Sequence, residues 1–121
     1  MKNKTFWESV KCAIKGIIYG YKTEKNFRTY TFIVLFFTVV NILLKVHPLA
    51  YLYLIIAGMG AFSLECMNTA IEHICNMMTE DFNEKIKIIK DLAAGGVLYF
   101  GIAFFVGEFL IVGYYLWRML V

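Results

Sequence analysis

Three long apolar stretches dominate this chain, and they restrict the folds that it can adopt. They run from about residue 27 to 44, 49 to 78 and 85 to 117. About 20 predominantly apolar residues are enough for a helix to cross the hydrocarbon core of a bilayer. Hydrophobic residues make up 60% of the chain and charged residues 17%, which is the composition of a membrane protein. We therefore predict one all-α integral-membrane domain over residues 1–121, with three transmembrane helices.

The segment before these stretches, residues 4–22, has two faces at helical spacing. One face is apolar, and the other carries lysines, with Lys15 among them. This pattern predicts an amphipathic helix that lies in the membrane interface with its lysines available to anionic headgroups. A helix packed on a soluble partner is the alternative. Because the lysines alternate with apolar residues, we do not expect nucleic-acid binding.

The basic residues of the chain are unevenly distributed. Of the 12, seven lie between Lys2 and Arg28 and three within residues 85–90, whereas Lys45 and Arg118 stand apart. Cytoplasmic segments of membrane proteins carry an excess of Lys and Arg. We therefore expect the N-terminus and the loop before the third membrane helix to face the cytoplasm, and the C-terminus to face the outside.

Two carboxylates, Glu65 and Glu72, lie within the second apolar stretch. Seven residues of helix turn by about 700°, so both acids lie on nearly one face, roughly 10 Å apart along the axis. An ionised carboxylate near the bilayer centre costs about 2.5–3.5 kcal/mol on the insertion scale. Such residues in a membrane helix generally mark a functional site. Together with Asn68, which lies between them, they form the candidate active-site stripe.

The depths of these acids favour different chemical roles. The deeper one, Glu65, is suited to act as general base toward a hydroxyl group at the same level. The shallower one, Glu72, is suited to hold Mg²⁺ together with a second carboxylate, Glu24, and substrate phosphates. Lys90 and Asp91 enter the third stretch at about the same depth and offer a phosphate-binding cation and a polar partner. A polar cluster that serves only helix packing is the alternative.

Four blocks of sequence follow one another in the order of a known family. They are Ala13-Ile-Lys15-Gly16, Glu24-Lys-Asn26-Phe27-Arg28, Glu65-Cys-Met-Asn68-Thr69-Ala70-Ile71-Glu72 and Lys87-Ile-Ile-Lys90-Asp91-Leu-Ala93-Ala94-Gly95-Gly-Val97-Leu98. In these blocks the chain resembles the small prokaryotic integral-membrane diacylglycerol kinases and their undecaprenol kinase relatives.

The resemblance implies a homotrimer in the bacterial cytoplasmic membrane, with shared active sites on the cytoplasmic side. These sites would use ATP and Mg²⁺ to phosphorylate a lipid hydroxyl. Glu65 is implied to be the general base, and Glu24 and Glu72 the metal ligands. The other residues implied to contact the nucleotide are Asn68, Asn76, Lys90 and Asp91, and those implied to contact the lipid are Glu65, Asn68 and Lys15.

Two positions depart from the family pattern. Asn76 stands where an aspartate is common, which removes one negative charge near the nucleotide site, and Tyr30 stands where one branch commonly has histidine. Neither is the proposed base or a proposed metal ligand, so we expect activity. The form of the blocks favours undecaprenol as substrate, with diacylglycerol as the alternative. An intramembrane glutamate also serves proton-coupled transporters, which is the alternative of another class.

One further acid, Glu108, lies beside Gly107 in the third stretch and belongs to none of the blocks. Two interpretations are open: a neutral acid hydrogen-bonded to a neighbouring helix, or a residue near the outer interface. Because four to five helical turns separate it from Asp91, we expect no catalytic role.

Overall fold

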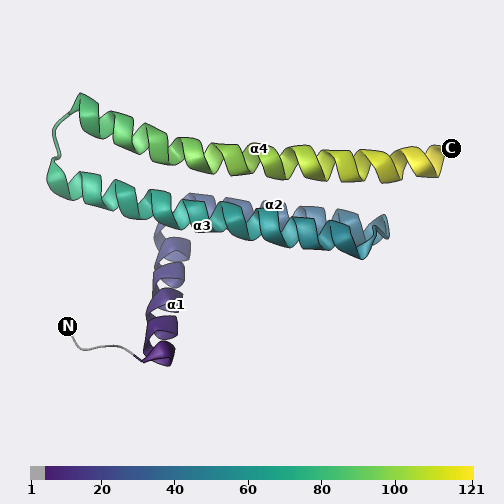
Figure 1. Cartoon of the computed structure of the whole chain (residues 1–121), viewed down its shortest axis with the longest axis horizontal. Coiled ribbons are helices and arrows are strands. Elements are labelled where there is room, and N and C mark those ends of the chain that lie inside the picture. Colours follow the sequence, from purple (N-terminus) through teal and green to yellow (C-terminus); the bar gives the residue numbers. More distant parts are fainter. Residues whose placement is uncertain (1–4) are drawn as a thin grey trace.

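The computed structural model describes residues 5–121, and their regular structure is entirely helical (Figure 1). This confirms the predicted all-α class. The helices, in chain order, are α1 (Phe6–Thr23), α2 (Lys25–Leu43), α3 (Pro48–Met78) and α4 (Glu84–Leu120). The predicted helix ends agree with these to within three residues. Residue 4, where the predicted surface helix begins, lies outside the described residues.

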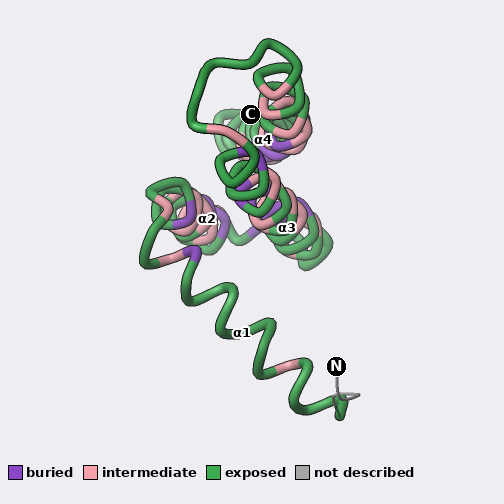
Figure 2. Tube along the Cα trace, turned by 90° about the vertical axis from the view of Figure 1, so that its left-hand side faces the viewer, coloured by how far each residue is buried: buried purple, intermediate pink, exposed green. Residues whose placement is uncertain are grey.

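Three of the helices, α2, α3 and α4, are long and apolar enough to cross a membrane. They run side by side with α3 between α2 and α4 (Figures 1 and 2). The chain is thus a multi-pass membrane protein. Its 31-residue α3 is about 46 Å long and its 37-residue α4 about 55 Å, which exceeds the roughly 30 Å of hydrocarbon in a bilayer. Both helices extend past the start of α2 (Figure 1).

The two ends of the bundle differ in their connections. At one end, which we call the turn end, residues 44–47 join α2 to α3. Lys45 adopts a left-handed conformation with φ of 51°, and Pro48 occupies the first turn of α3, where its missing N–H costs nothing. At the other end, the loop end, residues 79–83 join α3 to α4. There Asn83 caps α4 by accepting hydrogen bonds from the N–H groups of Lys85 and Ile86, at 3.0 and 3.2 Å.

The first helix, α1, lies crosswise to the bundle and meets it at the loop-end side of α2 (Figure 1). Nearly all of its residues are exposed, as expected of a helix that lies on a membrane surface. Its last turn is held on α2 by a 2.7 Å hydrogen bond between the hydroxyls of Tyr21 and Thr31 and by another of 2.7 Å from Arg28 to the Tyr21 carbonyl. The chain bends between α1 and α2 at Glu24, whose backbone is extended.

Close packing of α4 on α3 depends on small residues. The Tyr53 hydroxyl of α3 donates a hydrogen bond to the Ala103 carbonyl of α4 and lies directly against Gly107, where a Cβ atom would overlap it. On the other face of α3, Gly58 lies next to Val34 of α2. Small residues at such contacts let membrane helices approach closely. The buried core between the three helices consists of Phe37, Leu54, Ala57 and Phe104.

We expect Gly107→Ala to lower the free energy of unfolding by about 1–3 kcal/mol, the usual cost of an overpacked contact. The reason is the overlap of the new methyl group with the Tyr53 hydroxyl. Titration of the purified protein with a denaturing detergent, followed by circular dichroism, measures the change. Gly113→Ala is the matched control, because nothing lies within 4 Å of a Cβ atom there. Equal stability of both variants would contradict the role given to Gly107.

Candidate functional site

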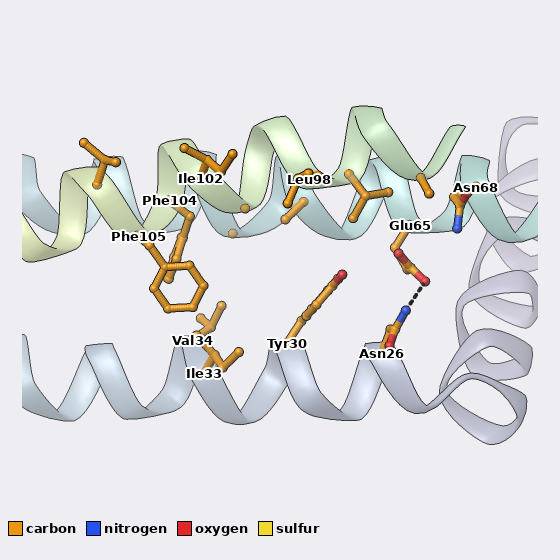
Figure 3. A pocket seen from close by; sticks show the side chains of 16 residues that line it. Asn26, Tyr30, Ile33, Val34, Glu65, Asn68, Leu98, Ile102, Phe104 and Phe105 are labelled. Atoms are coloured by element: carbon orange, nitrogen blue, oxygen red, sulfur yellow. Dashed lines mark hydrogen bonds between the residues drawn. The ribbon is translucent and has the colours of Figure 1, made fainter. Parts of the chain in front are cut away.

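A cleft with a volume of about 530 Å³ opens between α2 and α4, and α3 forms its floor (Figure 3). Most of its wall is apolar. The side chains that line this apolar part include Ile33, Val34, Val97, Leu98, Ile102, Phe104 and Phe105. Its polar end, toward the loop end of the bundle, is lined by Asn26, Tyr30, Glu65 and Asn68. The cleft therefore has the amphiphilic lining that suits a molecule with a polar head and an apolar tail.

Glu65 is the acid of this cleft, and it is only 2% exposed. The Asn26 side chain of α2 donates a hydrogen bond of 3.0 Å to its carboxyl oxygen Oε1 (Figure 3). A buried polar group is costly unless it has such a partner. Asn68 lies three residues further along α3 and lines the same end of the cleft. The structure thus brings Glu65 and Asn68 together, as the stripe on one helix face predicts.

The two other predicted acids lie nearer the surface. Glu72 is exposed on α3, and Glu24 is half-buried at the junction of α1 and α2, where its side chain makes no capping hydrogen bond. Glu24 belongs to a segment fixed on both sides. On the C-terminal side of Glu24, Asn26 contacts Glu65 of α3. On its N-terminal side, the Tyr19 hydroxyl lies 3.4 Å from the imidazole of His73, also on α3. Glu24 therefore lies at the same end of α3 as the Glu65–Glu72 stripe.

The lysine and aspartate that open α4 have separate partners. Lys90 reaches across to α3 and donates a hydrogen bond of 2.6 Å to the Asn76 side-chain oxygen. Asp91 forms an exposed ion pair of 2.5 Å with Lys87, one turn earlier on its own helix. Asn76, which stands where the resembled family commonly has aspartate, thus supplies the amide oxygen that orients Lys90. Because this partner is a neutral amide, it does not offset the positive charge of Lys90.

The remaining predicted contacts are dispersed within this single chain. Lys15 is exposed on α1 and does not line the cleft. Within residues 5–121, no three of the His, Cys, Asp and Glu side chains gather as a metal site. Mg²⁺ is usually bound by one or two protein carboxylates and takes its other ligands from phosphates and water. Two carboxylates at the loop end are therefore enough. Glu24 and Glu72 fit that requirement by type and by the end of the bundle at which they lie.

Two residues of the polar end were given no role by the sequence. In the sequence Asn26 is only one member of a block, and its pairing with Glu65, 39 positions away, is visible only in the structure. Tyr30 departs from the family pattern in the sequence, and in the structure it points into the cleft (Figure 3). The signal for both was their helical spacing: Asn26 and Tyr30 are four residues apart and so share one face of α2.

We expect Asn26→Ala to lower the free energy of unfolding by about 1–3 kcal/mol, because it leaves the buried Glu65 carboxyl without its partner. The detergent titration described above measures this loss. Thr29→Ala is the control: it removes an exposed hydroxyl of α2 that bonds only to the carbonyl of Lys25 in the same helix. If both variants are equally stable, the Asn26–Glu65 bond does not hold α2 on α3.

Fold and site together define a class: a small multi-pass helical membrane protein with a carboxyl group at the polar end of a lateral apolar cleft. Comparison with known proteins narrows this class. The profile of the prokaryotic diacylglycerol kinase family matches residues 11–112. The chain belongs to this family of membrane lipid kinases, which confirms the resemblance carried by the four sequence blocks.

Two curated relatives carry different names. An undecaprenol kinase of Bacillus subtilis strain 168 is 31% identical over 97 residues, which are 80% of this chain and 79% of that protein. A diacylglycerol kinase of Synechocystis sp. is 33% identical over 96 residues, which are 78% of this chain but 55% of that protein. This chain therefore spans about half the length of the second relative. The two identities are too similar to separate the two substrates.

Proposed function

We propose that this chain transfers the γ-phosphoryl group of ATP to the hydroxyl of a membrane lipid. Undecaprenol is the first candidate substrate, and diacylglycerol is the alternative. The observation that carries the proposal is the position of Glu65, a buried carboxyl group at the polar end of an apolar cleft. A lipid alcohol that lies along the apolar wall presents its hydroxyl at that end. The preference for undecaprenol rests on the form of the sequence blocks.

Glu65 acts in this proposal as the general base. The lipid hydroxyl oxygen forms a bond to the γ-phosphorus while the bond from that phosphorus to the departing ADP breaks. The hydroxyl proton passes to the Glu65 carboxylate. Phosphoryl transfer requires positioning, charge stabilisation and a base, and it needs no covalent protein intermediate. Asn26 holds the carboxyl in place through its 3.0 Å hydrogen bond, and Asn68, which lines the same end of the cleft, contacts the substrates in this proposal.

Glu24 and Glu72 hold Mg²⁺ in this proposal. The ion, when bound with ATP, supplies the positive charge that phosphoryl transfer requires. Lys90, oriented by Asn76, binds phosphate oxygens, and Asp91 lies beside it on α4. Lys15, on the surface helix, contacts the lipid headgroup region. We further propose that three copies of the chain form a homotrimer in the cytoplasmic membrane of a bacterium, with the N-terminus and the active site on the cytoplasmic side.

We expect Glu65→Gln to reduce phosphate transfer by about 10²- to 10⁴-fold, the usual contribution of a general base. The measurement is ³²P transfer from ATP to undecaprenol and to diacylglycerol, side by side, by the purified protein. Glu80→Gln, an exposed acid in the loop 79–83, is the matched control and should retain activity. A proton-coupled transporter would label no lipid in any form. Full activity of Glu65→Gln would remove Glu65 from the mechanism.

We expect Glu24→Gln and Glu72→Gln to raise the Mg²⁺ concentration for half-maximal rate by about tenfold or more, since each removes one of two anionic ligands. Excess Mg²⁺ should restore part of the lost rate, whereas it should not rescue Glu65→Gln. Glu84→Gln, an exposed acid in the first turn of α4, serves as control. An unchanged Mg²⁺ dependence in both variants would exclude these two residues as the metal ligands.

A further inference from the structure

A second buried acid, Glu108 of α4, lies far from the proposed chemistry and is 0% exposed. The Asn41 side chain of α2, also 0% exposed, donates a hydrogen bond of 3.1 Å to its oxygen Oε2. The depth of the pair follows from Tyr115, whose hydroxyl accepts a hydrogen bond from the backbone of His47 in the turn 44–47. Glu108 precedes Tyr115 by seven residues, so it lies about 10 Å inside the turn end.

Each member of the pair keeps one unsatisfied atom. The buried oxygens Oε1 of Glu108 and Oδ1 of Asn41 have no hydrogen-bond partner. Buried polar atoms without partners are rare and call for an explanation. Both are acceptors as long as the acid is ionised. A proton on Oε1 makes this oxygen a donor, which can give a hydrogen bond to Oδ1. One proton then satisfies both oxygens, as in the reciprocal pairing of a carboxylic acid with an amide.

The charges around the pair also favour the neutral acid. Within residues 5–121, Glu108 takes part in no ion pair. The two basic residues of the turn end, Lys45 and Arg118, are exposed, and Arg118 lies over the Tyr114 ring at 5.9 Å. An ionised carboxylate without a cation is strongly disfavoured among apolar side chains. A neutral acid that shares two hydrogen bonds with Asn41 carries no such cost.

The pair also occupies a particular place in the fold. Elsewhere α2 and α4 touch little, because the cleft separates them. Among the side-chain hydrogen bonds within residues 5–121, the Asn41–Glu108 bond is the one that joins α2 directly to α4. One turn nearer the cleft, Phe37 of α2 packs edge-on against Phe104 of α4, with ring centroids 5.5 Å apart. Phe104 lines the cleft, so the pair lies about one helical turn beyond the end of the cleft that Phe104 lines.

We propose that Glu108 is a neutral acid in a reciprocal hydrogen-bonded pair with Asn41, and that this pair is a positioning element for the lipid site. It holds α2 against α4 beyond the end of the cleft that Phe104 lines, and so sets the width of the cleft that the lipid chain meets. The second part rests on the proposed lipid kinase function, whereas the first does not. Removal of the pair impairs binding of the lipid chain and leaves the chemistry at Glu65, toward the other end of the cleft, intact.

The protonation state can be tested without any activity. Infrared difference spectra between the wild type and Glu108→Gln, both as purified protein in lipid, should show the loss of the carbonyl band of a protonated carboxylic acid. Loss of a carboxylate band in its place would overturn the proposal. Asn41→Ala and Glu108→Ala should each destabilise the protein, and the double variant should be little worse than either, because each breaks the same pair. Additive losses would contradict the pairing.

Glu108→Gln keeps the proposed geometry, because a glutamine amide also donates one hydrogen bond to Asn41 and accepts another. It should therefore retain the stability and the KM for lipid of the wild type. Glu108→Ala should raise the KM for undecaprenol roughly 5- to 30-fold, the effect of losing one or two hydrogen bonds, with kcat and the KM for ATP within about twofold. Leu110→Ala, an exposed residue two positions further on, is the control.

The outcomes separate the two proposals. If wild-type protein phosphorylates neither lipid but shows the infrared band and the non-additive losses, the lipid kinase proposal fails and the pair stands. If Glu108→Gln loses as much activity as Glu108→Ala, the acid has a role that an amide cannot replace, and the positioning proposal is overturned. A fall in kcat without a change in the KM for lipid in Glu108→Ala would overturn it equally.

Discussion

The burial of the Glu65 carboxyl group among apolar side chains is the constraint on which the rest of the structure depends. With 2% of its surface exposed, this group needs a partner, and Asn26 of α2 supplies it. The bond sets the level at which α2 meets α3. Because α1 continues into α2 at Glu24, the same bond also fixes where the surface helix joins the bundle.

The cleft arises from unequal packing of the helices. Glycines let α3 and α4 approach closely: Gly60 of α3 lies against the Phe100 ring of α4, and Gly107 of α4 accommodates Tyr53 of α3. Within the described residues α2 has contacts with α3 as well, whereas its ring contacts and its side-chain hydrogen bond to α4 come from Phe37 and Asn41, in the second half of the helix. Two helices that share one neighbour and touch at one end leave a groove between them along the rest of their length. The apolar site follows from this geometry.

The sequence predicts the elements and one face of the site, because both depend on local patterns. Apolar runs give the membrane helices, Pro48 places the start of α3, and helical spacing puts Glu65 and Asn68 on one side. Pairings between helices, by contrast, do not follow from local sequence patterns. Asn41 and Glu108 are 67 positions apart, and no local pattern indicates how α2 is rotated against α4. The cleft escapes prediction for the same reason, since its lining comes from three helices.

The second helix carries two asparagines, and each donates a hydrogen bond to a buried glutamate of another helix. The two pairs are chemically alike, so their different roles have to come from their surroundings. Glu65 lines a cleft that is large enough to admit part of a lipid, whereas Glu108 is fully enclosed and does not line it. An acid can exchange a proton with a substrate only where the substrate can reach it. Access, more than residue type, therefore separates the proposed catalytic acid of this chain from the acid that holds its helices together.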